Sequence, residues 1–70
     1  MIGIVQYWNR ERGFGFVLRT DCDEQVFFNI REVKNAMNSE IKRGTLVEYE
    51  LEEGKKATLV CVNVHVIKDE

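Results

Sequence analysis

Apolar and polar residues alternate along several short stretches of this 70-residue chain, and no stretch of useful length has helical periodicity. Alternation with a period of two is typical of strands that bury one face and expose the other. The clearest example is residues 45–52, where Val47, Tyr49 and Leu51 share one face and glutamates occupy the other. The pattern predicts an all-β fold.

Five strands are predicted, at residues 2–8, 14–19, 26–30, 45–52 and 58–67. The longest connection, residues 31–43, has apolar residues spaced by four, which allows a turn or two of helix. Its Asn, Ser and Arg content favours an irregular loop. Five short antiparallel strands with one long connection after the third predict a small barrel, closed or partly open, because closure removes exposed edges. We expect one domain over residues 1–70.

The last predicted strand carries four valines at alternate positions, which we expect on one face: Val60, Val62, Val64 and Val66. The two cysteines, Cys22 and Cys61, are too few for a disulfide-stapled secreted domain and are predicted to be reduced, with Cys61 buried. The single histidine, His65, has no partners for a metal site or for catalysis. We therefore predict a cytoplasmic non-enzyme with no metal, no cofactor and no membrane segment.

The segment "RGFGFV" places Phe14 and Phe16 on the same face of the second strand. If Gly15 and Val17 point inward, both rings point outward. The third strand, "VFFNI", repeats the pattern, with Val26, Phe28 and Ile30 predicted inward and Phe27 and Asn29 outward. Aromatic residues in strands usually belong to the core, but a barrel of this size has no room for three more rings inside.

Exposed aromatic rings beside arginines have a known physical use. Unpaired bases stack on aromatic side chains, each gaining about 1–3 kcal/mol. Neighbouring Arg and Lys neutralise phosphates and release counterions. The net charge of −2 does not exclude a nucleic-acid partner, because binding depends on local charge. Arginines concentrate in the first half of the chain and glutamates in the second. The pattern predicts binding of single-stranded nucleic acid.

Three segments, "GIVQYWN", "RGFGFV" and "VFFNI", resemble in order and spacing the hallmark segments of the cold-shock domain, including its two ribonucleoprotein motifs. The resemblance extends from about Gly3 to Val66. It implies an OB-type five-stranded barrel that binds single-stranded RNA or DNA through its first three strands. We expect the protein to act as a monomer. Carried over by position, the implied binding residues are Tyr7, Trp8, Arg12, Phe14, Phe16, Phe27 and Lys56. The predicted site also includes Asn29, which stands at the position of a stacking histidine, and the nearby cation Arg31.

The chain departs from the family pattern at several positions. Gln6 replaces a lysine, Asn29 replaces a stacking histidine and Ile30 replaces a phenylalanine; Asn38 falls where many members have an aromatic residue. Loss of two stacking partners, at about 1–3 kcal/mol each, weakens binding by well over tenfold. These losses leave an alternative open, in which the diverged barrel is a protein-interaction module or the terminal domain of a longer protein. The leading interpretation is a nucleic-acid binder acting as an RNA chaperone.

Overall fold

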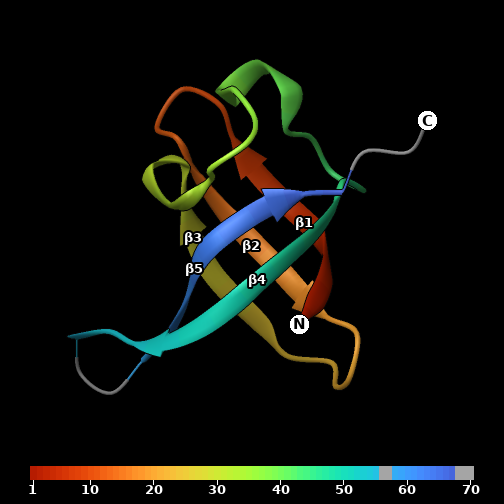
Figure 1. The fold of residues 1–70 in the computed structure, drawn as a ribbon, viewed down its shortest axis with the longest axis vertical. Coiled ribbons are helices and arrows are strands. Elements are labelled where there is room, and N and C mark those ends of the chain that lie inside the picture. The colour runs from red at the N-terminus through yellow and green to blue at the C-terminus, as the bar shows by residue number, and fades with distance from the viewer. Residues whose placement is uncertain (56–57, 68–70) are drawn as a thin grey trace.

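The computed structural model describes residues 1–55 and 58–67. Within these residues the chain forms five strands and two short 3-10 helices (Figure 1). The elements are β1 (Ile2–Asn9), β2 (Phe14–Arg19), β3 (Gln25–Asn29), η1 (Ile30–Glu32), η2 (Asn38–Glu40), β4 (Leu46–Glu53) and β5 (Leu59–Val66). Strand boundaries agree with the prediction to within about one residue, so the alternation of apolar residues located each strand correctly.

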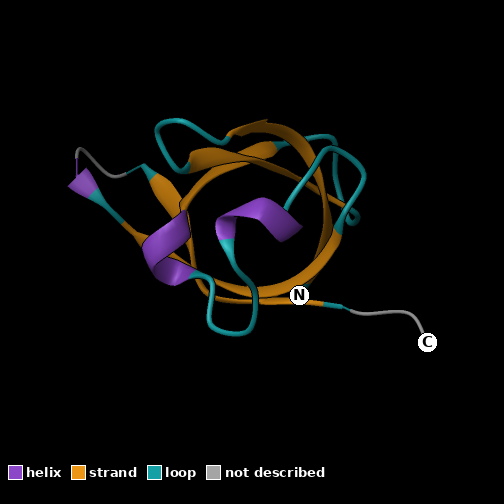
Figure 2. Cartoon of the chain, turned by 90° about the horizontal axis from the view of Figure 1, so that it is seen from above, coloured by secondary structure: helices purple, strands orange, loops and turns teal. Residues whose placement is uncertain are grey.

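The strands close into a barrel in the order β1-β2-β3-β5-β4, which confirms the predicted five-stranded barrel. Pairing is antiparallel between β1 and β2, β2 and β3, β1 and β4, and β4 and β5. The ring closes through a short parallel contact in which Phe27 of β3 lies opposite Val60 of β5. Figure 2 looks along the barrel and shows the strands as a closed ring.

The core fills the inside of this ring. Its buried members are Val5, Val17, Val26, Phe28, Ile41, Val47, Tyr49, Cys61 and Val64. Most come from alternate positions of the strands, as predicted. Ile41 instead follows η2, which lies across one end of the barrel (Figure 2), and its side chain is 1 % exposed. The long connection is therefore an irregular loop with two short helical turns that covers the barrel end.

One expectation about β5 is wrong, because its valines do not share a face. Glu48 and Glu50 of β4 are two residues apart, but they pair with His65 and Val62, which are three apart. The extra residue is a β-bulge, and Asn63 there has a φ of 49°. The bulge reverses the alternation, so that Cys61 and Val64 are both fully buried.

The third strand ends one residue earlier than predicted. Ile30 begins η1 instead of continuing β3, and the Asn29 side chain caps this helix by accepting a hydrogen bond of 3.0 Å from the backbone N–H of Arg31. Ile30 still packs against the buried core. Its predicted inward orientation is thus retained in a different local structure.

Candidate nucleic-acid interface

Four aromatic side chains gather on the outer surface of β1, β2 and β3. We call Tyr7, Phe14, Phe16 and Phe27 the ring cluster. Phe27 contacts two of the other rings, with its ring centroid 5.7 Å from that of Phe14 in a stacked arrangement and 6.0 Å from that of Phe16 edge to face. Tyr7 lies 6.2 Å from each of Phe14 and Phe16. The predicted grouping of the three phenylalanines on one face is confirmed.

Strand register explains the cluster. Phe16 is opposite Phe27 across the β2–β3 pair and opposite Tyr7 across the β1–β2 pair, so the three side chains project from the same face. Tyr7 reaches this face because β1 contains a bulge at Gln6: Val5 pairs with Val17, and Tyr7 pairs with Phe16. Without the extra residue, Tyr7 and Val5 would share the inward face.

The rings of the cluster are only partly accessible. Phe14, Phe16 and Phe27 are half-buried because they cover one another, and none belongs to the buried core. Tyr7, at the edge, is 46 % exposed, and its hydroxyl accepts a hydrogen bond of 3.3 Å from Asn9 Nδ2. The cluster is a continuous apolar surface that offers aromatic faces to a ligand.

Trp8, which was expected at a stacking position, lies apart from the ring cluster. Its indole stacks on the buried Phe28, with ring centroids 5.1 Å apart, and its Nε1 donates a hydrogen bond of 3.0 Å to Asn38 Oδ1. Gly15, paired with Trp8, makes this packing feasible, because a Cβ at Gly15 would lie 2.8 Å from Trp8 Cε3. The contact of Trp8 with nucleic acid stays a prediction.

Two of the predicted cations flank one edge of the ring cluster. Phe14 pairs with Asn29, and the exposed Arg12 and Arg31 lie two residues beyond them in the adjoining turns. The turns are joined by a hydrogen bond of 2.8 Å from the Ile30 N–H to the Gly13 carbonyl. The two turns that carry Arg12 and Arg31 therefore lie side by side, next to the Phe14–Asn29 end of the β2–β3 pair. Lys56, also predicted to bind, lies outside the described residues.

The sequence prediction left out Lys42 and Arg43. With Arg10, they surround a groove next to Tyr7 at the end of the long connection. Two adjacent basic residues were the only sign in the sequence that this segment could bind an anion. The position of the groove could not be found from the sequence, because it depends on how the loop returns to β1.

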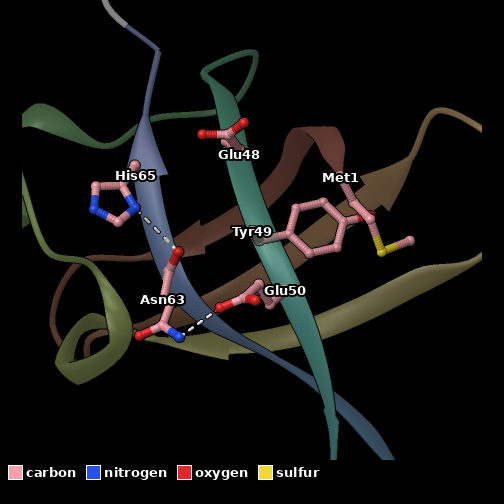
Figure 3. Close-up of a pocket in the computed structure, with 6 residues that line it drawn as sticks. All are labelled: Met1, Glu48, Tyr49, Glu50, Asn63 and His65. Atoms are coloured by element: carbon pink, nitrogen blue, oxygen red, sulfur yellow. Dashed lines mark hydrogen bonds between the residues drawn. The ribbon is translucent and has the colours of Figure 1, made fainter.

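Four of the twelve acidic residues lie on β4: Glu48, Glu50, Glu52 and Glu53. This strand is separated from β2 by β1. A hollow of about 300 Å³ at β4 and β5 is lined by Met1, Glu48, Tyr49, Glu50, Asn63 and His65, which Figure 3 shows as sticks. Asn63 Nδ2 donates to Glu50 Oε1 at 2.6 Å, and His65 Nδ1 lies 3.1 Å from the Asn63 carbonyl oxygen. A basic face separate from an acidic face stays a prediction, because Glu11 and Glu32 adjoin Arg12 and Arg31 in the chain.

Three further properties of the described residues concern metal binding, membrane crossing and thiol reactivity. Within residues 1–55 and 58–67, no cluster of three or more His, Cys, Asp or Glu side chains is arranged to hold a metal ion. The described helices are all too short to cross a membrane. Burial raises the pKa of the Cys61 thiol to about 12, so this cysteine stays protonated and unreactive at neutral pH.

A small closed barrel with an aromatic surface over three adjacent strands is the architecture of OB-type barrels that bind single strands. The chain matches the family described as "'Cold-shock' DNA-binding domain" over residues 1–66. It therefore belongs to the cold-shock domain family, which is generally nucleic-acid binding, and the resemblance predicted from the sequence is confirmed.

Individual relatives support this assignment. The chain is 32 % identical over 62 residues to "Cold shock-like protein CspG" of Shewanella violacea, covering 89 % of this chain and 87 % of the relative. It is 36 % identical over 55 residues to "Probable cold shock protein y4cH" of Sinorhizobium fredii, covering 79 % and 80 %. It is 31 % identical over 65 residues to "Cold shock-like protein CspC" of Escherichia coli, covering 93 % of both.

Proposed function

We propose that this chain binds single-stranded RNA or DNA by stacking unpaired bases on the ring cluster, with arginines beside it contacting the phosphates. The observation that carries the proposal is the placement of four aromatic rings on one outer surface of β1, β2 and β3. Stacking requires only a π-face, so the binding tolerates many sequences. By holding strands unpaired, the protein shifts RNA away from self-paired structures, which is the action of an RNA chaperone.

The geometry supports stacking over simple packing. The barrel already has a complete core, and none of the four rings is part of it. Phe27 contacts two neighbouring rings, so its aromatic face is held in a fixed orientation before a base arrives. A prearranged face lowers the entropy cost of binding.

The test is a titration of a fluorescein-labelled oligothymidine followed by fluorescence anisotropy. Phe27→Ala should weaken binding by about five- to 150-fold, the equivalent of about 1–3 kcal/mol for one stacked base. Phe27→Leu keeps the apolar bulk and removes the π-face, and it should also weaken binding. Leu46→Ala is the matched control, because Leu46 is an exposed apolar residue on β4, at 44 % exposure, outside the ring cluster.

Equal affinities for wild type, Phe27→Leu and Leu46→Ala would contradict stacking. Salt adds a second criterion, since phosphate contacts make affinity fall as salt rises. A wild-type protein that fails to bind oligothymidine, but retains protein partners from a lysate after nuclease treatment, would contradict the proposal and identify a protein-interaction module.

A further inference from the structure

A groove of about 330 Å³ opens next to the ring cluster. Strand β1 contributes Gln6, Tyr7 and Trp8, the turn that follows contributes Arg10, and the loop before β4 contributes Lys42 and Arg43. Tyr7 belongs both to this groove and to the ring cluster, so the two surfaces are continuous. We call it the basic groove.

The groove exists because β1 is longer than its pairing with β4. That pairing ends at Ile4 and Leu46, with two further hydrogen bonds of 2.8 Å in which Val5 N–H donates to the Thr45 carbonyl and Gly44 N–H donates to the Val5 carbonyl. From the bulge at Gln6 onward, this edge of β1 has the loop beside it in place of a strand. The space between them is the basic groove.

Side-chain hydrogen bonds hold the walls of the groove together. Asn38 bridges them, because its Oδ1 accepts from Trp8 Nε1 at 3.0 Å and its Nδ2 donates to the Arg10 carbonyl at 2.9 Å. The Thr45 hydroxyl accepts from the Lys42 N–H at 3.2 Å. The groove is therefore formed before a ligand enters, and little ordering is needed on binding.

The lining of the groove is positively charged. Arg10, Lys42 and Arg43 are all exposed. Among the residues that the structure describes, the ion pair found is Arg19 with Asp21, at 2.9 Å, and none of the three groove cations takes part in it. Three cations around one hollow make a favourable site for the anionic backbone of a nucleic acid.

We propose that the basic groove holds one further nucleotide of the single strand bound at the ring cluster, with Lys42 and Arg43 neutralising its flanking phosphates. The inference rests on the proposed function. A volume of about 330 Å³ lies near the lower limit of the range that is usual for ligand pockets. The groove therefore has room for one nucleotide and not for a longer segment. The strand passes from the ring cluster over Tyr7 into the groove. Gln6 lines the same groove and replaces a lysine of the family pattern, so Lys42 and Arg43 supply positive charge where that lysine is missing.

The experiment measures oligothymidine affinity by anisotropy over a series of salt concentrations. For single strands, the logarithm of the binding constant falls by about 0.7 per phosphate contact for each tenfold increase in salt. The double variant K42Q/R43Q should therefore lower the slope by about 1.4. Over a fourfold increase in salt, it should lose about sevenfold less affinity than wild type.

Two controls separate a groove contact from a general effect of charge. K42R/R43K keeps both cations in the groove and should keep the wild-type slope. Lys34→Gln removes an exposed lysine whose backbone N–H bonds to the Val64 carbonyl, outside the groove, and should leave the slope unchanged. Circular dichroism spectra check that each variant is folded.

The outcomes distinguish the two proposals. If wild type binds with a salt-dependent affinity and K42Q/R43Q has the same slope, the groove inference is overturned and the proposed function stands. An equal decrease in slope for Lys34→Gln and for Arg43→Gln also overturns the groove inference. If wild type does not bind oligothymidine, both proposals fail.

Discussion

The hydroxyl group of Tyr49 gives a sharp test of the barrel interior. Tyr49 is 1 % exposed, and its hydroxyl oxygen has no hydrogen-bond partner among the described residues. A buried polar group without a partner costs about 1–3 kcal/mol relative to the solvated unfolded chain. Tyr49→Phe removes that cost and leaves the ring in place, so we expect the variant to be more stable.

The expected size follows from two opposing effects. Relief of desolvation contributes about 1–3 kcal/mol. The space left by one oxygen atom costs only a few tenths of a kcal/mol, at about 24 cal/mol per Å³. The net gain should be about 1 kcal/mol or more, which raises the melting temperature of a domain of this size by about 4–8 °C per kcal/mol. Thermal and urea unfolding followed by circular dichroism measure this directly.

Tyr7→Phe is the matched control, since it removes the same atom from an exposed position. The Tyr7 hydroxyl is in contact with solvent and with Asn9, so its loss should change the free energy of unfolding by less than about 0.5 kcal/mol. A lower stability for Tyr49→Phe, with no change for Tyr7→Phe, would show that the Tyr49 hydroxyl has a partner and would refute the reasoning.

Three further predictions concern Gly15, the buried Cys61 thiol and the basic groove. Gly15→Ala should lower the free energy of unfolding by about 1–3 kcal/mol in urea denaturation, because its Cβ would overlap the Tyr7 carbonyl oxygen and crowd Trp8. Burial raises the pKa of Cys61 to about 12, so the thiol of the unfolded chain loses its proton at a lower pH than the thiol of the folded protein. The free energy of unfolding should therefore fall as the pH rises above about 8.5. Cys61→Ala removes this effect, so its urea midpoint should fall less over the same pH range than that of wild type. Gln6→Lys adds a cation to the groove and should steepen the salt dependence of oligothymidine binding by about 0.7.

The sequence predicted the barrel and the ring cluster because both depend on local alternation. Phe14, Phe16 and Phe27 sit at positions whose neighbours are small or apolar and point inward, so a strict period of two fixes their side of the wall. The pairing of β2 with β3 then follows from the short turn between them. No long-range information was needed to place these three rings together.

The bulges could not be predicted from alternation, because a bulge interrupts it. In β5, four alternate valines indicated one continuous face, but the extra residue at Asn63 moves Val64 into the core with Cys61. In β1, the bulge at Gln6 decides which of two adjacent aromatic residues joins the ring cluster. Tyr7 points outward and Trp8 packs on Phe28, although both were predicted to bind.

The basic groove was beyond sequence reasoning for a different reason. Its walls are about 30 residues apart in the chain, and they meet through the side chain of Asn38, which bonds to both Trp8 and Arg10. At this position an amide replaces the aromatic residue of many family members. The substitution removes a possible stacking partner and supplies both hydrogen bonds that fix the loop. A residue that looked like a loss in the sequence has a structural role in the fold.

The net charge of −2 does not determine how a nucleic acid meets this barrel. Electrostatic interactions between exposed charges decay over about 8 Å at physiological ionic strength, and the molecule extends 35 × 26 × 18 Å. The glutamates of β4 lie on a different part of the barrel wall from the ring cluster, and β1 separates their strand from β2. In the proposed binding mode, a strand at the ring cluster is therefore attracted by Arg12, Arg31 and the cations of the basic groove. In the same mode, the glutamates of β4 repel the phosphate backbone, which favours an encounter at the aromatic face.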